Sequence, residues 1–302
     1  MPDKILVTTS TFGESDSSPI LLLEQAGYKV VLNPYKRKLT KEESKKLLPG
    51  HVGLIAGLET LDDEVLSVSG LKVISRCGSG MSNVDLEAAK RRKIEVCSTP
   101  EAPVNAVAEL TLGCLLSLLR RISQLDQLMH QGTWKKHTGR ELTGKTIVII
   151  GFGRIGRRLS ALLSPFAVKQ IIVDPLVKDI PAGIRQMALK DALALADIIS
   201  LHCSGDKCVL GREELSLIKK GVLILNAARG GLIDETALQE ALERGQVDGA
   251  WLDTFRTEPY TGPLLKNDRV LLTPHIGSYT GECRSEMEMQ AAKNLLTALK
   301  KG

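Results

Sequence analysis

Short runs of apolar residues alternate with stretches of helical pattern over the second half of the chain, from residue 144 onward. Apolar runs without polar alternation are typical of strands buried on both faces, and helical stretches between them indicate a parallel sheet. The pattern therefore predicts a doubly wound, Rossmann-type α/β domain. The predicted strands are TIVII (146–150), IIVD (171–174), DIISLH (197–202), VLILN (222–226), GAWLD (249–253) and RVLLT (269–273).

The first hundred residues repeat this rhythm less regularly and predict a second, smaller α/β domain. Apolar runs again alternate with helical stretches such as SPILLLEQAG, TKEESKKLL and VDLEAAKRRK. Together the two halves predict an α/β protein of two doubly wound parallel-sheet domains, a flavodoxin-like domain followed by a Rossmann domain. The strands expected in the first half are KILVTT (4–9), YKVVLN (28–33), HVGLIAG (51–57), LKVISRCG (71–78) and IEVCST (94–99).

Two further helices define the expected domain boundaries. The stretch TPEAPVNAVAEL begins a long helix that we expect to continue to about residue 130, and its middle is apolar nearly all round. Such a helix is buried between layers or against a partner subunit. The C-terminal stretch EMEMQAAKNLLTALKK is also helical in pattern and is expected to return to the first domain. We therefore assign residues 1–98 and 277–302 to a substrate domain and residues 99–276 to the dinucleotide-binding domain.

Composition narrows the classes of function. The 40 Lys and Arg residues only slightly outnumber the 35 Asp and Glu residues, the basic clusters are scattered, and aromatic residues make up 3% of the chain. Nucleic-acid binding favours a concentrated basic stripe with aromatic platforms, so we expect no nucleic-acid partner. An anionic small molecule needs only one or two of these cations.

Targeting and cysteine patterns indicate a cytoplasmic protein without metal. The N-terminal residues MPDKILVTTS do not resemble a signal peptide, and the most apolar segment, residues 110–119, is too short to span a bilayer. Six cysteines without a C-x-x-C pair fit a reducing compartment rather than a disulfide framework. The segment HCSGDKC (202–208) holds one His and two Cys, but a metal site requires more ligands at better spacing.

A glycine-rich motif, GFGRIG, follows the strand TIVII and opens a helix. Gly151 permits a tight turn, Gly153 lets a pyrophosphate approach the backbone, and Gly156 lets the helix and strand pack closely. The N-terminus of the helix adds N–H donors and a positive dipole end. Asp174 ends the next strand, 18 residues after Gly156, close to the spacing of about 20 expected for an acid that binds the ribose hydroxyls. The motif predicts NAD, because a carboxylate would repel the 2′-phosphate of NADP.

Polar side chains follow the later strands of the predicted sheet. Arg229 follows VLILN, Asp253 and Glu258 follow GAWL, and His275 follows RVLLT. Ligands of an open parallel sheet bind outside the carboxyl ends of its strands, so these side chains should converge near the nicotinamide. Histidine exchanges a proton near neutral pH, a neighbouring carboxylate stabilises its imidazolium form, and arginine can clamp a carboxylate. This set is what a nicotinamide-dependent reaction at a carbon bearing oxygen requires.

With these motifs in place, the sequence resembles the D-2-hydroxyacid dehydrogenase family, and the 3-phosphoglycerate dehydrogenases within it. The resemblance runs nearly end to end. It rests on RCGSGMSNVDLEAA, STPEAPVNAVAELTLG, ELTGKTIVIIGFGRIGRRL, LNAARGGLIDETAL, GAWLDTFRTEP and LLTPHIG. It implies an NAD-dependent oxidoreductase that transfers a hydride between nicotinamide and a D-2-hydroxy or 2-oxo acid. It also implies an active site in a cleft between the domains and a homodimer formed through residues of about 101–145.

The resemblance also assigns roles to residues. It implies that Arg229 binds the carboxylate and carbonyl of the substrate, that Glu258 supports the histidine, and that His275 is the acid/base. The backbone of Ser79 and Gly80 would receive the substrate carboxylate. The predicted cofactor-binding residues are Gly151, Gly153, Arg154, Ile155, Gly156, Asp174, His202 and Asp253.

Three departures from the family pattern leave the substrate open. The 302-residue sequence carries no counterpart of the C-terminal regulatory extension of some phosphoglycerate dehydrogenases. Ser204 stands where a proline often follows the strand, and Ala56 and Leu58 stand where authentic phosphoglycerate dehydrogenases carry arginines. The alternatives are therefore 3-phosphoglycerate dehydrogenase, glyoxylate or hydroxypyruvate reductase and, from another class, an NAD(H)-sensing protein like the C-terminal-binding corepressors. Retention of Arg229, Glu258 and His275 favours an enzyme.

Overall fold

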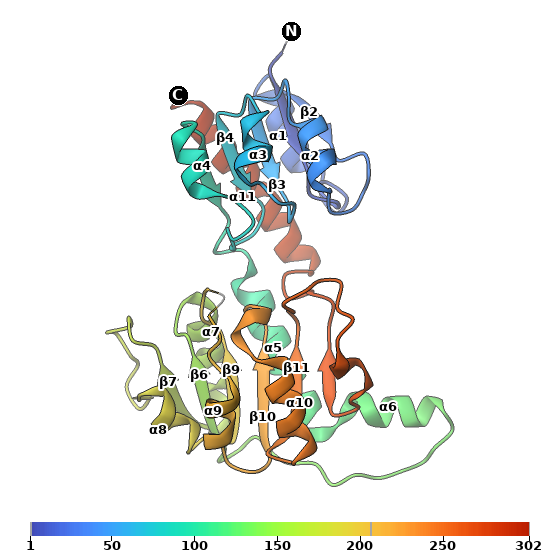
Figure 1. Cartoon of the computed structure of the whole chain (residues 1–302), viewed down its shortest axis with the longest axis vertical. Coiled ribbons are helices and arrows are strands. Elements are labelled where there is room, and N and C mark those ends of the chain that lie inside the picture. Colours follow the sequence, from blue (N-terminus) through green and yellow to red (C-terminus); the bar gives the residue numbers. More distant parts are fainter. Residues whose placement is uncertain (1, 206, 302) are drawn as a thin grey trace. The chain divides into compact units, whose positions relative to one another are not determined.

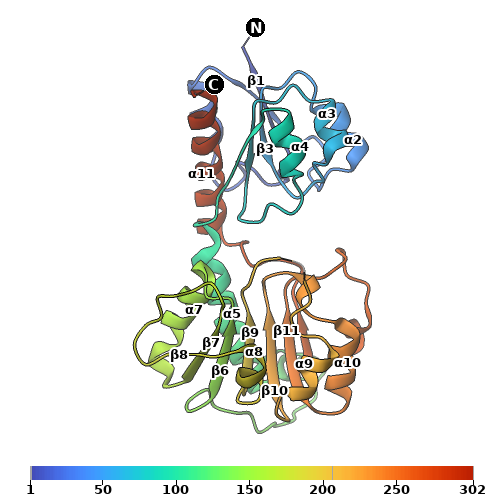
Figure 2. The same cartoon turned by 60° about the vertical axis from the view of Figure 1, so that its left-hand side comes forward.

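The computed structural model describes residues 2–205 and 207–301, and this part of the chain forms two compact units (Figures 1 and 2). The first unit consists of the described residues up to Pro103 and from Ser278 onward. The second unit is Val104–Gly277. Each unit has its own parallel sheet, so the chain has the predicted α/β fold class.

The first unit is built on a sheet with the strand order β2-β1-β3-β4-β5, which is the flavodoxin-like order. All of its pairings are parallel. The strands are β1 Lys4–Val7, β2 Lys29–Leu32, β3 Gly53–Ala56, β4 Val73–Arg76 and β5 Glu95–Ser98. The helices are α1 Ser18–Gln25, α2 Lys41–Leu47, α3 Asp63–Ser67, α4 Leu86–Arg91 and α11 Gly281–Leu299.

Helices cover both faces of this first sheet. Successive residues of a strand point to opposite faces, so neighbouring residues pack against different helices. Ile5 and Val7 pack with α1 and with the C-terminal helix α11. Leu6, between them, packs with residues of α3 and α4 on the other face. Helix α11 therefore completes the core of the unit in which the chain begins, as Figure 2 shows.

The second unit is built on a sheet with the order β12-β11-β10-β9-β6-β7-β8, again parallel throughout. This is the Rossmann order with one further strand at the β12 edge. The strands are β6 Thr146–Ile150, β7 Lys169–Val173, β8 Arg185–Gln186, β9 Ile198–Leu201, β10 Val222–Asn226, β11 Val247–Leu252 and β12 Val270–Leu272. The α-helices are α5 Pro103–Arg120, α6 Ile122–His130, α7 Arg154–Leu163, α8 Leu189–Leu193, α9 Arg212–Leu217 and α10 Glu235–Glu243. Short 3-10 helices are η1 Ser164–Phe166, η2 Gly230–Leu232 and η3 Pro263–Lys266.

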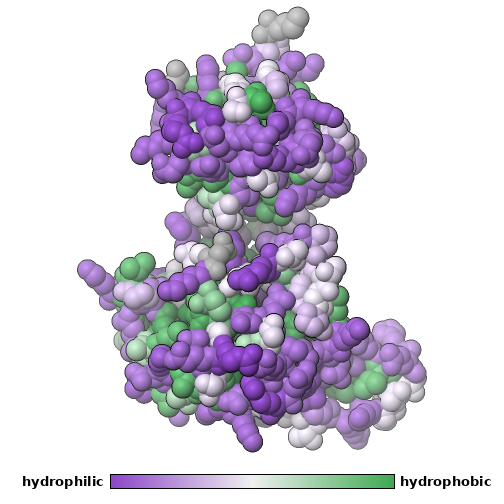
Figure 3. Space-filling model, in the orientation of Figure 1, coloured by the Kyte–Doolittle hydropathy of each residue, from purple (hydrophilic) through white to green (hydrophobic). Residues whose placement is uncertain are grey.

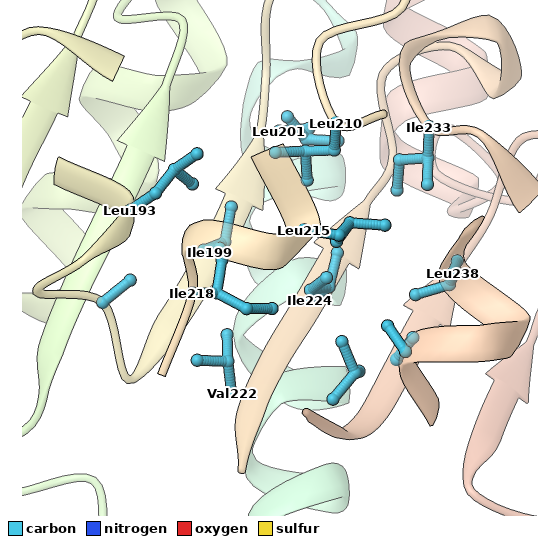
Figure 4. Packing of buried hydrophobic residues seen from close by; sticks show 14 of the residues in the cluster. Leu193, Ile199, Leu201, Leu210, Leu215, Ile218, Val222, Ile224, Ile233 and Leu238 are labelled. Carbon is cyan, nitrogen blue, oxygen red and sulfur yellow. The ribbon is translucent and has the colours of Figure 1, made fainter. Parts of the chain in front are cut away.

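Two apolar clusters hold helices on the two faces of this second sheet. Ile199 and Ile224 face a cluster formed with α8, α9 and α10, part of which Figure 4 shows from close by. Ile198 and Leu225 face the opposite cluster, formed with α5 and α7. The near-continuous apolar strands in the sequence thus reflect burial on both faces.

The helix expected to run unbroken to about residue 130 is two helices, so this expectation was wrong. Arg121 has a φ of 51°, in the left-handed region, which a right-handed helix cannot contain, and α6 begins at Ile122. The Arg121 guanidinium donates to Asp248 Oδ1 at 3.1 Å. The sequence gives no warning of this break, because arginine is a good helix former.

In the part of the chain that the structure describes, one helix, α5, is long and apolar enough by length and composition to cross a membrane. Ala108, Leu115 and Leu119 of this helix pack in the core of the second unit. The core helix of a soluble protein passes the same test of length and composition, so this feature is weak support for a membrane span.

The surface seen in Figure 3 is mostly hydrophilic, with hydrophobic atoms in scattered patches. One mixed region covers the projection formed by α6, at the lower right of Figures 1 and 3. Three large side chains in and after this helix are exposed: Ile122, Met129 and Trp134.

Candidate active site

The glycine loop after β6 is built by close backbone contact with the end of the neighbouring strand β9. Gly151 has a φ of 92°, and a Cβ on it would lie 2.4 Å from the Cys203 nitrogen. The His202 N–H donates to Ile150 O at 2.7 Å, so the two strand ends are also joined by a hydrogen bond. Only glycine fits this turn, as the motif predicted.

The next two glycines leave the loop suited to a pyrophosphate. A Cβ on Gly156 would lie 2.2 Å from the Gly151 carbonyl oxygen, so its absence lets α7 approach β6. Gly153 caps α7, and no atom lies within 4 Å of where its Cβ would be. Arg154 and Ile155 begin the helix. The open space at Gly153 and the N–H groups of the first helical turn fit a dinucleotide phosphate group.

Asp174 lies at the carboxyl end of β7 and is tied to the glycine loop. Its Oδ2 accepts from the Phe152 N–H at 2.8 Å, and its Oδ1 accepts from the Leu176 N–H at 2.9 Å. These two bonds fix the orientation of the carboxylate, and each oxygen keeps a second lone pair for a ribose hydroxyl.

His202 lies at the carboxyl end of β9, next to the glycine loop. Burial lowers the pKa of His202 to about 4, so the ring is neutral at physiological pH. Its Nε2 forms a hydrogen bond with Ser200 Oγ at 2.8 Å. Among the residues that the structure describes, 2–205 and 207–301, no three His, Cys, Asp or Glu side chains are grouped so that they could hold a metal ion.

Arg229 is carried by the loop after β10, which Asn226 shapes. The Asn226 Oδ1 accepts from the Ala228 N–H at 3.0 Å, and its Nδ2 donates to Arg229 O at 2.9 Å. The Arg229 guanidinium donates to Ala228 O at 2.6 Å. A Cβ on Gly230 would lie 1.9 Å from the Phe255 carbonyl carbon, so this glycine lets the Arg229 loop touch the loop after β11.

His275 and Glu258 come together as a pair. His275 Nδ1 lies 3.1 Å from Glu258 Oε1 and 3.0 Å from Oε2. Because an ionised carboxylate can only accept, Nδ1 is the donating nitrogen in this contact. The Phe255 N–H donates to Glu258 Oε1 at 3.1 Å and helps to hold the carboxylate. The His275 side chain is 39% exposed, so its ring remains accessible from solvent.

Asp253, at the carboxyl end of β11, is buried and engaged by the chain itself. It accepts from the Thr273 hydroxyl at 2.6 Å and from the backbone N–H groups of Ile276 and Gly277 at 2.9 and 2.8 Å. Its contact with the cofactor stays a prediction.

Ser79 and Gly80 belong to the first unit, directly beyond the carboxyl end of β4. Ser79 is exposed, and the preceding Gly78 has a φ of 140° and donates its N–H to Thr99 Oγ1 at 2.8 Å. The loop thus presents backbone groups at the edge where ligands of parallel sheets bind.

The second unit matches a family sequence profile. Residues 112–277 match the profile described as D-isomer specific 2-hydroxyacid dehydrogenase, NAD binding domain. The chain belongs to this family. As a member of the D-isomer specific 2-hydroxyacid dehydrogenases, it carries their NAD-binding domain, and the glycine loop and Asp174 described above lie within the matched residues.

Individual relatives in the family agree with this assignment. The chain is 38% identical over 256 residues to D-3-phosphoglycerate dehydrogenase of Mycobacterium leprae (strain TN), an alignment that covers 82% of the chain and 48% of the relative. The chain spans about half the length of the curated relatives it matches.

Solved structures of the same fold cover the chain almost completely. Protein TT0316 from Thermus thermophilus is 35% identical with a TM-score of 0.91, over 99% of this chain and 97% of that one. A glyoxylate reductase from Paecilomyes thermophila is 29% identical with a TM-score of 0.88, over 100% of this chain and 97% of that one. These relatives support the family to which the chain belongs, but their names point to different substrates.

Some residues that build the site in this family member were missed by sequence reasoning. Asn226, Gly230, Trp251 and Thr273 all shape the loops at the strand ends. Asn226 and Thr273 had a usable signal, since each is a polar residue that ends an apolar strand run. For Trp251 the sequence offers no such signal, because its indole N–H donates to Thr273, which follows another strand.

Proposed function

We propose that this chain is an NAD-dependent D-2-hydroxyacid dehydrogenase in which His275 is the proton donor and acceptor. The observation that carries the proposal is the contact between His275 Nδ1 and the Glu258 carboxylate beyond the strands of an NAD-binding domain. A histidine held in this way through Nδ1 has Nε2 left for the substrate. Reduction of a 2-oxo acid by the purified chain with NADH tests the proposal.

The residues divide the work of the reaction among them. Bound NADH supplies the hydride for reduction of the 2-oxo acid. His275 gives a proton from Nε2 to the carbonyl oxygen, and Glu258 orients the ring and stabilises its imidazolium form. Arg229 pairs with the substrate carboxylate and polarises the carbonyl, and the backbone of Ser79 and Gly80 receives the same carboxylate.

NAD rather than NADP is supported by Asp174. Its carboxylate is fixed by the Phe152 and Leu176 N–H groups at the end of β7, where it suits the ribose hydroxyls. A phosphate at the 2′ position would face this negative charge. The proposed cofactor set is Gly151, Gly153, Arg154, Ile155, Gly156, Asp174, His202 and Asp253.

A homodimer and a cytoplasmic location are further parts of the proposal. Ile122, Met129 and Trp134 expose large apolar side chains in and after α6, within the segment of about 101–145 that the family resemblance links to dimer formation. Exposed apolar side chains that gather on one projection favour burial against another copy of the chain.

The substrate is proposed to be a small anionic or polar 2-oxo acid, such as hydroxypyruvate or glyoxylate, rather than a phosphorylated one. A phosphate needs cations, and Ala56 at the end of β3 is buried and uncharged. Arg76, at the end of β4, is only 7% exposed, and its guanidinium donates to Cys77 O. This arginine, which precedes the Ser79–Gly80 loop in the chain, is thus engaged inside the first unit.

Glu59 is an acidic side chain on whose pKa the charge of that arginine acts. It is fully buried, and its Oε1 accepts from the Gly57 N–H at 3.1 Å and from the Thr8 hydroxyl. Burial raises the pKa of Glu59, and the Thr8 and Gly57 hydrogen bonds and the charge of Arg76 act in the opposite direction. Arg76 is the cation whose charge favours the ionised form of this buried carboxyl group, so we infer that its charge serves Glu59 rather than a substrate phosphate.

Replacing Glu59 should therefore change substrate preference. We expect Glu59→Gln to raise kcat/KM for 3-phosphohydroxypyruvate relative to hydroxypyruvate about three- to tenfold, the effect of roughly 1 kcal/mol of electrostatic free energy. The parent should prefer hydroxypyruvate. Glu42→Gln, an exposed change on α2 of the same unit, is the matched control and should leave the ratio unchanged.

A different outcome would point to another source of phosphate recognition. If the parent strongly prefers the phosphorylated acid and Glu59→Gln leaves that preference intact, the proposed substrate class is wrong. The remaining cations to test are Lys135 and Lys136, which follow the exposed Trp134 and would act from a neighbouring subunit. Loss of the preference in a Lys135→Ala/Lys136→Ala double variant would assign it to them.

A further inference from the structure

The segment that carries His275 folds around a single buried carboxylate. Asp253 Oδ1 accepts from the Thr273 hydroxyl at 2.6 Å and from the Ile276 N–H at 2.9 Å, and its Oδ2 accepts from the Gly277 N–H at 2.8 Å. The residues on both sides of His275 are thus bonded to the same group. Asp253 is 1% exposed, so these bonds form away from water.

His275 itself has a backbone conformation that needs such support. Its φ is 54°, in the left-handed region that only a few per cent of non-glycine residues adopt, although His is enriched there with Asn and Asp. Its N–H donates to Thr273 O at 2.9 Å across this tight turn. Such a backbone conformation persists when surrounding bonds fix it, and the bonds of Asp253 to Thr273, Ile276 and Gly277 lie on both sides of His275.

Trp251 fixes the direction of hydrogen bonding in this network. Its indole Nε1–H donates to Thr273 Oγ1 at 2.9 Å, and the Trp251 side chain is fully buried in β11. An indole N–H can only donate, so the Thr273 hydroxyl must accept from it. The single hydroxyl proton of Thr273 is then directed to Asp253.

We propose that Trp251 and Thr273 are positioning residues for the acid/base His275, acting through Asp253. The inference rests on the proposed function, because it concerns the proton transfer assigned to His275. In this ordered chain of hydrogen bonds Trp251 donates to Thr273 and Thr273 donates to Asp253, and the chain holds the turn over residues 273–277 and keeps the imidazole against Glu258. None of the three needs to touch the substrate for this role.

The network also accounts for the glycine after Ile276. A Cβ on Gly277 would lie 3.1 Å from Asp253 Oδ2 and 3.2 Å from Val107 Cγ2 of α5. Its absence lets the Gly277 N–H reach the carboxylate in a space closed by α5. The turn is therefore bounded by Asp253 on one side and by a packed helix on the other.

Removing the Thr273 hydroxyl tests the inference. Thr273→Val keeps the shape of the side chain, and we expect kcat to fall about tenfold to a hundredfold, as small misplacement of a catalytic group does. Affinity for NADH should stay near that of the parent. Thr273→Ser, which restores the hydroxyl, should recover most of kcat.

A second measurement reports on the histidine without turnover. The chain has five histidines, so labelling histidine with ¹⁵N gives a spectrum with few signals. In the parent and in Thr273→Ser, the hydrogen bond to Glu258 should protect the His275 Nδ1–H proton from exchange with water. We expect the signal of this proton to broaden or disappear in Thr273→Val. Trp251→Phe removes the first donor, and its effect on kcat should not add to that of Thr273→Val, because both act through one chain of bonds.

The matched control is Thr111→Val. Thr111 is buried in the second unit, and its hydroxyl donates to Val107 O at 2.7 Å within its own helix, so activity should stay at the parent level. If the parent is active and Thr273→Val matches it in kcat and in the His275 signal, the positioning role is wrong. If the parent reduces no 2-oxo acid, the proposed function fails instead. A fall in melting temperature with unchanged kcat would show a purely structural role and would also overturn the inference.

Discussion

His275→Ala should lower kcat by about a hundredfold to ten-thousandfold, the range that a positioned general acid or base contributes. The alanine removes the ring nitrogen that exchanges the proton and leaves Glu258 in place. Affinity for NADH should stay close to that of the parent, because the glycine loop and Asp174 are formed by other strand ends. Steady-state kinetics with hydroxypyruvate and direct NADH titration together check both parts.

The chain supplies a matched control for this change. His130 also lies beside a carboxylate, with its Nε2 3.6 Å from Asp126 Oδ1, but its side chain is 82% exposed on α6. His130→Ala should leave turnover at the parent level. A His275→Ala variant whose kcat lies within tenfold of the parent would exclude this histidine as the acid/base.

Gly151→Ala and Gly153→Ala should separate the folding role of the glycine loop from its binding role. At Gly151 a Cβ would lie 2.4 Å from backbone of Cys203, and the φ of 92° is unfavourable for alanine. We expect this variant to lose about 2 kcal/mol or more of unfolding free energy and to bind NADH poorly. Thermal unfolding and NADH titration measure the two effects.

Gly153→Ala should behave differently. The residue has a φ of −76°, and a Cβ there meets no atom of the chain within 4 Å, so stability should change by less than about 0.5 kcal/mol. The same Cβ would occupy the space through which the pyrophosphate approaches, so NADH affinity should fall about tenfold or more, which is the loss of roughly 1.4 kcal/mol. A Gly153→Ala variant that binds NADH as the parent does would show that the pyrophosphate does not lie over this loop.

Local patterning was enough to predict the fold class. A strand such as Val222–Asn226 is apolar up to its last residue because both faces of its sheet are covered, and that property is visible in sequence. The break at Arg121 was not predictable, because a left-handed residue in a run of good helix formers carries no compositional mark. The two-residue strand Arg185–Gln186 is too short to show alternation or an apolar run.

The candidate site was predictable to the extent that single residues mark strand ends. The glycine motif, Arg229, Glu258 and His275 could be found because each follows an apolar run. The bond that Trp251 makes joins β11 to the residue that follows β12, 22 positions further along the chain, so no local pattern contains it. The same holds for the effect of Arg76 on the pKa of Glu59, since it depends on the order in which β3 and β4 pair.

The most direct test of the central claim is the configuration of the product. The purified chain is incubated with NADH and hydroxypyruvate, the loss of NADH absorbance is followed, and the glycerate formed is resolved into its enantiomers. We expect NADH consumption matched by formation of D-glycerate. Formation of L-glycerate, or no NADH consumption with hydroxypyruvate, glyoxylate or 3-phosphohydroxypyruvate, would contradict the assignment of this chain as a D-2-hydroxyacid dehydrogenase.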